Sequence, residues 1–270
     1  MTTNLRSAVS SVTCWGSPAA TKHALLIHGL TSSSGCWFRI AQQLAVEGYF
    51  VVAPDLLGHG TAPLSTDCSS SALAAALHPL FLPSRPSFSV IVGHSLGGVV
   101  ALELIHLLPR AQTTPVILLD PPLLPLDQAP AHKQTMQRME KSCAFVVAEV
   151  TTNIPTVDGL LSTNPGWSRE DVVWKVLAAQ LCDSATVEAI FRQNHPWSFV
   201  HLLEQDLSNV SLSIIGADPA ITQPSFLADT AKPFPHIRTS IAKGASHSIH
   251  REFPDLVVAS ALDAVSAASM

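Results

Sequence analysis

Ser95 lies in a sequence pattern that suits nucleophilic catalysis. It is the central residue of the stretch GHSLGG at 93–98, which has the G-x-S-x-G spacing of a nucleophile elbow. A serine hydroxyl is a weak nucleophile at neutral pH, so it needs a neighbouring base and an acid that orients the base. The chemistry to look for is therefore attack of Ser95 on a carbonyl carbon.

The surroundings of this motif fit a sharp turn from a strand to a helix. An apolar, β-branched run at 88–93 precedes it and a helical pattern at 96–108 follows it. Glycines beside the serine remove side chains that would collide in such a turn. The N–H of Leu96 would then stabilise an oxyanion. The alternative is a tight turn that happens to contain a serine.

His247 is the best candidate for the base among twelve histidines. It follows the last expected strand, at 237–242, and would lie at the same sheet edge as Ser95. His250 is the nearest rival. The histidines at 28, 59 and 94 adjoin glycines in turns, where local hydrogen bonding explains them.

Two aspartates compete for the role of the orienting acid. Asp218 follows the expected strand at 210–216, and Asp120 ends the strand before it. Both give the chain order serine, aspartate, histidine. We prefer Asp218, because it lies one strand from the histidine loop, and expect the other carboxylate to cap a turn.

The first buried strand, at 24–28, is followed by a glycine that allows the backbone to approach a substrate. The N–H of Leu30 is the expected second oxyanion donor, and that of Thr31 is the fallback. The alternative is a plain turn between a strand and a helix, since a short His-Gly pair alone is weak evidence.

The elements around these residues predict an α/β protein with a mostly parallel, doubly wound sheet. Most of the strand-length apolar runs lack polar alternation, as strands buried on both faces do. Helical patterns separate them. The runs lie at 24–28, 49–53, 88–93, 116–120, 210–216 and 237–242.

Residues 121–207 break this alternation with helical patterns, so we expect a helical cap inserted before the penultimate strand. Residues 1–120 and 208–270 would then form the core domain. The alternative is a packing subdomain with no role at the site. Large apolar side chains of the cap are candidates to contact a substrate, although cap packing explains them equally well; these are Met136, Trp167, Trp174 and Trp197.

Composition narrows the class of protein. Of 270 residues, 47% are hydrophobic and the formal net charge is −5, which disfavours disorder and nucleic-acid binding. No apolar stretch reaches the ~18 residues of a membrane span, and the first residues lack a secretory signal. Five cysteines without metal spacing favour a reducing, cytoplasmic location. We expect a small-molecule substrate and a monomer or homodimer.

Taken together, these motifs resemble the α/β-hydrolase superfamily. The matching features run from the His-Gly loop through the turn at 54–60, the elbow, the Gly-Ala-Asp218-Pro stretch and the His247 loop. The resemblance implies a serine triad, two oxyanion donors and a helical lid. The serine chemistry expected at Ser95 needs no metal or organic cofactor. Asp218 follows Gly216 by two residues, where such proteins commonly have G-x-x-D. The segment before His28 is short, so we expect the first strands of such proteins to be reduced here to a hairpin near 9–15.

The expected function is an intracellular serine hydrolase for an ester, lactone or thioester of a small, fairly apolar metabolite. The same triad could instead serve an acyltransferase, a lyase or a carbon–carbon bond hydrolase. A third possibility is a non-catalytic ligand receptor or interaction module on the same scaffold. The sequence does not choose the substrate.

Overall fold

The computed structural model describes residues 11–123, 129–222 and 237–269, and for 129–136, 138 and 139 it gives the backbone alone. Seven strands form one sheet in the order β1-β3-β2-β4-β5-β6-β7. All neighbouring strands run parallel except β1, which pairs antiparallel with β3. The strands are β1 (Val12–Trp15), β2 (Lys22–Ile27), β3 (Tyr49–Pro54), β4 (Val90–His94), β5 (Thr114–Leu119), β6 (Val210–Gly216) and β7 (Arg238–Ile241).

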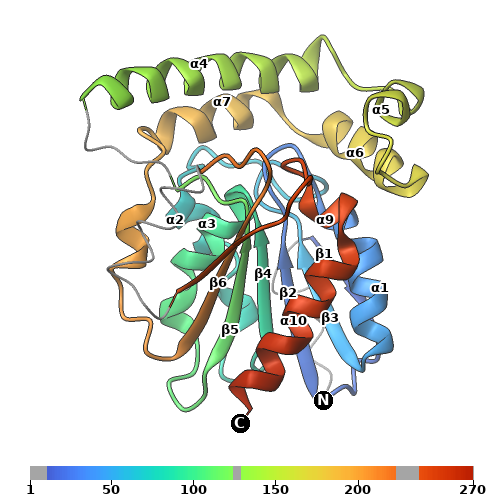
Figure 1. Cartoon of the computed structure of the whole chain (residues 1–270), viewed down its shortest axis with the longest axis vertical. Coiled ribbons are helices and arrows are strands. Elements are labelled where there is room, and N and C mark those ends of the chain that lie inside the picture. The colour runs from blue at the N-terminus through green and yellow to red at the C-terminus, as the bar shows by residue number, and fades with distance from the viewer. Residues whose placement is uncertain (1–10, 124–128, 223–236, 270) are drawn as a thin grey trace.

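Helices cover both faces of the sheet (Figure 1). α1 (Phe38–Val46) and α10 (Pro254–Ala268) pack on one face, and α2 (Ser70–Ala75) and α3 (Leu96–Glu103) on the other. Alternate residues of one strand therefore enter different cores: Leu25 and Ile27 join the α3 side, whereas Ala24 and Leu26 join the α1 side. Burial on both faces is the reason that the strands read as continuous apolar runs.

In the described part of the chain, four further α-helices and a 3₁₀ turn (Val200–Leu203) lie between β5 and β6. The four α-helices lie over the carboxyl ends of the strands (Figure 1). They are α4 (Ala129–Thr151), α5 (Val157–Thr163), α6 (Arg169–Leu181) and α7 (Ser184–Gln193), and we call them the upper helices. Ser168 and Asp171 form a capping box at α6, and the Asp183 side chain accepts from the Thr186 N–H at α7. Both caps provide acceptors for N–H groups that the first turn of a helix leaves without internal partners.

The predicted fold class, a mostly parallel doubly wound sheet, is confirmed. Details differ from the sequence patterns. Instead of a hairpin near 9–15, the described part of that segment is one strand, β1, which pairs with β3. The helix expected at 96–108 ends at Glu103 and continues as a 3₁₀ turn at Ile105–Leu107. α2, α5 and the one-turn helix α9 (Ile249–Glu252) were not predicted.

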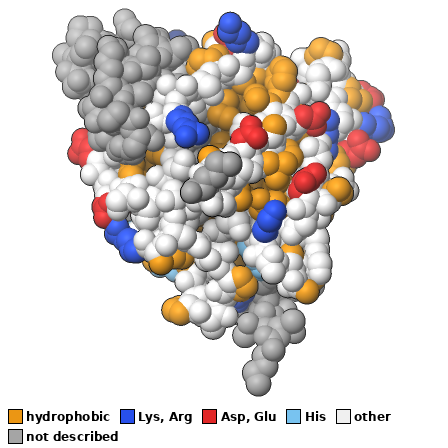
Figure 2. All heavy atoms as spheres, turned by 60° about the horizontal axis from the view of Figure 1, so that its bottom comes forward, with side chains coloured by type: hydrophobic (Ala, Val, Ile, Leu, Met, Phe, Trp, Pro, Cys, Tyr) orange, Lys and Arg blue, Asp and Glu red, His pale blue; other side chains and the backbone are white. Residues whose placement is uncertain are grey.

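Acidic and basic side chains are interspersed over the face shown in Figure 2, where hydrophobic side chains gather above the centre. Neither sign of charge dominates that face, in keeping with a formal net charge of −5. No helix in the described part of the chain combines the length and the apolar character needed to span a membrane.

Candidate active site

Ser95 occupies a strained turn between β4 and α3. Its backbone has φ +53° and ψ −120°, a conformation that costs free energy for any residue other than glycine. The flanking glycines make the turn possible. A Cβ on Gly93 would lie 2.4 Å from the Gly97 carbonyl oxygen, and one on Gly97 would lie 2.2 Å from the Ile27 carbonyl oxygen. The elbow predicted at 93–98 is therefore present.

His247 hydrogen-bonds a carboxylate through Nδ1. That atom lies 2.7 Å from Oδ2 of Asp120. Because the carboxylate oxygen accepts, Nδ1 donates, and Nε2 is left with a lone pair that can take a proton. The His247 side chain is 40% exposed, whereas the Asp120 side chain is 1% exposed. The ring therefore faces the cavity while its partner is buried in the protein.

Asp120 is fixed by the backbone around it. It has φ +45°, and its Oδ1 accepts hydrogen bonds from the N–H groups of Ala217 (3.2 Å) and Ile221 (3.1 Å). Such N–H donors stabilise a carboxylate that has been removed from water. The carboxylate is thus held beneath the imidazole by the chain that follows β6.

The pairing with Asp120 differs from the preferred prediction, which placed Asp218 beside the histidine. Asp218 is exposed, and its Oδ2 accepts from the Gly244 N–H at 3.3 Å. The strand register explains the difference. His94 of β4 pairs with Leu119 of β5, so the residues that follow them, Ser95 and Asp120, emerge side by side from adjacent strands.

The expected oxyanion residues lie at the same cavity. Leu30 and Leu96 both line it together with Ser95 and His247. Leu96 is the first residue of α3, where a helix offers its N–H no internal acceptor. The His-Gly loop is held by His28, whose Nδ1 donates to the Gly29 carbonyl (2.8 Å) and whose Nε2 accepts from the Leu56 N–H (3.0 Å).

The other histidines near the elbow pack in the interior. His94 and His250 are buried, with ring centroids 4.3 Å apart. Burial lowers the pKa of each ring well below its usual value, and neighbouring charges lower it further. His250, the rival base, packs on Trp37 and does not line the cavity. His250 is therefore a packing residue in this structure.

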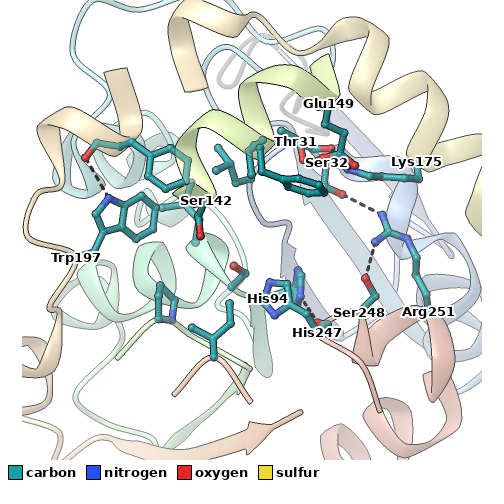
Figure 3. Close-up of a pocket in the computed structure, with 18 of the residues that line it drawn as sticks. Thr31, Ser32, His94, Ser142, Glu149, Lys175, Trp197, His247, Ser248 and Arg251 are labelled. Carbon is teal, nitrogen blue, oxygen red and sulfur yellow. Dashed lines mark hydrogen bonds and ion pairs between the residues drawn. The ribbon is translucent and has the colours of Figure 1, made fainter. Parts of the chain in front are cut away.

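The cavity has a volume of about 350 Å³ and lies between the sheet and the upper helices (Figure 3). Of the apolar residues expected to contact a substrate, Trp167 and Trp197 line it. Trp174 instead packs against Gly35, and the side chain of Met136 lies outside the described residues. Phe145, Val146 and Phe191 complete an apolar wall.

The cavity also has a polar end that the sequence analysis missed. Lys175, Glu149 and Arg251 line it, beside Thr31 and Ser32. The one available signal was the position of Arg251, four residues after His247 on the same short segment. Lys175 and Glu149 gave no signal, because charged residues on amphipathic helices usually face solvent.

No group of at least three histidine, cysteine, aspartate or glutamate side chains suited to a metal ion occurs among the described residues. The groups that converge at the cavity are a hydroxyl, an imidazole paired with a carboxylate and candidate backbone donors. This arrangement can perform acyl transfer with its own side chains.

Comparisons with known proteins find lipases and esterases. The chain is 38% identical over 104 residues to Lipase LipV of Mycobacterium tuberculosis (strain ATCC 25618 / H37Rv). The aligned residues make up 38% of this chain and 39% of that protein. It is 35% identical over 92 residues to Methylesterase 17 of Arabidopsis thaliana, or 33% of each chain. The matched part thus spans well under half the length of these curated relatives.

Solved structures extend the likeness to nearly the whole fold. A thioesterase domain from the curacin biosynthetic pathway superposes with TM-score 0.69 at 22% identity, covering 93% of this chain and 94% of that chain. The esterase EaEST of Exiguobacterium antarcticum superposes with TM-score 0.70 at 12% identity, covering 94% of each. The model of the alpha/beta hydrolase family matches residues 24–260. The chain therefore belongs to the alpha/beta hydrolase family.

Proposed function

We propose that this protein is a serine hydrolase that cleaves an ester-type bond, in an ester, lactone or thioester, of a small and partly apolar substrate. The observation that carries the proposal is the 2.7 Å hydrogen bond between His247 Nδ1 and Asp120 Oδ2 at the cavity that Ser95 lines. Family membership and the lipase and methylesterase relatives support an ester as the bond cleaved.

In the proposed mechanism, His247 Nε2 takes the proton of Ser95 Oγ as this oxygen attacks the substrate carbonyl carbon. The N–H groups of Leu30 and Leu96 stabilise the oxyanion, and each such donor contributes on the order of 3 kcal/mol to the transition state. Asp120 orients the imidazole and stabilises its protonated form. The imidazolium then protonates the leaving group, which departs to leave an acyl-enzyme.

Water completes the cycle in the second half of the mechanism. His247 removes a proton from the water as its oxygen attacks the acyl carbon, and the proton then returns to Ser95 Oγ. We propose residues 121–207 as a lid over this chemistry, because the upper helices lie over the carboxyl ends of the strands (Figure 1). Buried thiols at Cys36, Cys68 and Cys182 support the cytoplasmic location that we propose.

The test is reaction with a fluorophosphonate probe followed by peptide mapping. Ser95 shares its cavity with three other serines, Ser32, Ser142 and Ser248, so mapping decides which hydroxyl is the nucleophile. We expect the probe on Ser95 and no labelling of Ser95→Ala. The matched control is Ser266→Ala, which removes an exposed hydroxyl on α10 and should label as the wild type does.

Turnover of short-chain esters by the same variants is the second readout. We expect Ser95→Ala to lose at least about 10³-fold in kcat, while Ser266→Ala retains the wild-type value. Equal turnover by Ser95→Ala and the wild type would contradict the proposal. Product analysis in the presence of an added alcohol separates hydrolysis from acyl transfer to that alcohol.

A further inference from the structure

Arg251 is a buried cation at the cavity with few partners. The residue is 4% exposed and lies in α9, just after His247. Its Nη1 donates to Ser248 Oγ at 3.3 Å and its Nη2 to Ser32 Oγ at 3.4 Å. Its Nε has no hydrogen-bond partner among the described residues. A guanidinium has five N–H donors, so most of this group's hydrogen-bonding capacity is unused.

The neighbouring charges are already paired with one another. Lys175 Nζ lies 3.0 Å from Glu149 Oε1, and Arg39 Nη1 lies 3.0 Å from Asp171 Oδ2. Within the described part of the chain, Arg251 itself makes no ion pair. The carboxylates of Asp171 and Glu149 stabilise the Arg251 cation at longer range, but neither contacts its guanidinium directly among the described residues.

The ionisable groups near Arg251 respond to that charge. Burial is the main cause of the lowered pKa values of Lys175, His94 and His250, and the Arg251 charge lowers all three further. Burial also lowers the pKa of Arg251, but a guanidinium remains protonated in proteins. A buried charge without a partner is costly, so its position at a cavity indicates that a ligand supplies the missing anion.

The environment of the guanidinium favours a carboxylate over a larger anion. The Trp167 ring centroid lies 4.8 Å from Arg251 Cζ, and the Trp167 indole N–H donates to Glu252 Oε1 at 3.2 Å. The indole therefore braces the planar group, whose fork of N–H donors matches a carboxylate. Lys175 already contacts Glu149 and Thr31, which leaves Arg251, among the described residues at the cavity, as the cation that can bind an added anion. A single positive charge suits a monoanion.

The two ends of the cavity differ in character. In Figure 3, Arg251, Lys175 and Glu149 lie on one side and Trp197 on the other, with His94 and His247 between and below them. Phe191 continues the apolar side, where Trp197 Nε1 donates to its carbonyl oxygen at 3.1 Å. A bound molecule would thus place an anionic end and an apolar end on either side of the imidazole.

We infer that Arg251 binds a carboxylate of the substrate, so that the substrate is an ester carrying a free carboxylate away from the bond that is cleaved. This inference rests on the proposed ester hydrolysis by Ser95 and adds to it the class of substrate. Arg251 acts as a specificity determinant, while the apolar part of the same molecule packs near Phe191 and Trp197.

The test compares esters that differ in one charge. The first pair is monomethyl adipate and its uncharged isostere, in which an isopropyl group replaces the carboxylate. The second pair carries the charge on the alcohol side: the acetate ester of γ-hydroxybutyrate and the matching isopropyl-ended acetate. For the wild-type protein we expect kcat/KM to be at least about 10-fold higher for the charged member of at least one pair.

Three variants locate the origin of that preference. Arg251→Gln should lower the charged-to-uncharged ratio of kcat/KM by about 10- to 100-fold, and Arg251→Lys should give an intermediate ratio. The matched control is Arg110→Gln, which removes the same charge from an exposed ion pair with Asp206 and should keep the wild-type ratio. Circular dichroism and thermal melting show whether each variant folds.

Two outcomes would overturn the inference. In one, the wild-type protein prefers the uncharged member of both pairs, a result that needs no variant. In the other, Arg251→Gln lowers kcat/KM equally for the charged and the uncharged member of a pair, which indicates a purely structural role. If the glutamine variant does not fold, Arg251→Lys serves in its place. Failure of the proposed function looks different, because then no ester is turned over and the fluorophosphonate leaves Ser95 unmodified.

Discussion

His94, the residue before Ser95, holds the backbone of His247 in place. Its Nε2 donates to the His247 carbonyl oxygen at 2.8 Å, and the two ring centroids lie 4.6 Å apart. Burial keeps the His94 pKa well below its usual value, so the ring is neutral and has one N–H to donate. The elbow therefore positions the loop that carries the proposed base, while Asp120 orients the imidazole itself.

Asp120→Asn should lower kcat by about 10³- to 10⁴-fold with little change in KM. The variant replaces a carboxylate that accepts from His247 Nδ1 with an amide that can donate to it. The amide favours the wrong imidazole tautomer and no longer stabilises the imidazolium. Steady-state turnover of a short-chain ester measures the effect.

Asp218→Asn is the matched control for that prediction. Asp218 is exposed and accepts only from the Gly244 N–H at 3.3 Å among the hydrogen bonds of its side chain in the described residues. This variant should stay within about 3-fold of the wild-type kcat. If Asp218→Asn were the inactive variant and Asp120→Asn the active one, the assignment of the acid would be wrong.

The comparison of the two aspartates shows what the sequence can predict at this site. The strand-and-helix context of the GHSLGG motif was sufficient to predict the elbow, because glycine spacing and apolar runs are local signals. The choice of acid depended on which strand follows β4 in the sheet. That neighbour is β5, and strand order arises from long-range packing that no local pattern contains.

The polar end of the cavity likewise depends on contacts between distant segments that no local sequence pattern predicts. Arg251 and Lys175 come from α9 and α6, and Ser32 follows β2. The hydrogen bond from Arg251 to Ser32 and the one from Lys175 to Thr31 join residues that are 219 and 144 positions apart in sequence. The expected aromatic residues divide likewise: Trp167 and Trp197 line the cavity, but Trp174 packs on Gly35. Helical periodicity predicts a buried face and not the element that this face meets.

Buried histidines should make the protein less stable in mildly acidic solution. Burial lowers the pKa of His59 to about 3 and those of His94 and His250 well below the usual 6.5. Above pH 6.5 these rings are neutral in both the folded and the unfolded chain. Below that value the unfolded chain binds protons that the folded chain does not, so the free energy of unfolding falls by up to about 1.4 kcal/mol per pH unit for each ring.

Urea unfolding at pH 7 and pH 5 measures this dependence, and His250→Phe isolates one ring. His250 packs on Trp37 and His94, and neither of its ring nitrogens has a partner among the described residues. A phenyl ring keeps the packing and cannot titrate, so the loss between pH 7 and pH 5 should shrink. His201→Gln, at an exposed position, should retain the full loss. An unchanged slope in His250→Phe would show that its ring does not contribute.

The ion pair between Lys175 and Glu149 should contribute to folding, because it lies at the cavity and is largely shielded from water. It joins α6 to α4, the two side chains are 11% and 20% exposed, and Lys175 Nζ also donates to Thr31 Oγ1 at 3.0 Å. Lys175→Met leaves Glu149 partly buried without its cation, so it should cost about 3 kcal/mol of unfolding free energy. The double variant Lys175→Met/Glu149→Gln removes both charges and should cost less unfolding free energy than Lys175→Met alone.

Urea unfolding of the two variants tests which of them is less stable. The control is Arg110→Gln, because loss of its exposed ion pair should have no measurable effect on stability. A double variant that is less stable than Lys175→Met would mean that the loss comes from packing and not from the orphaned carboxylate.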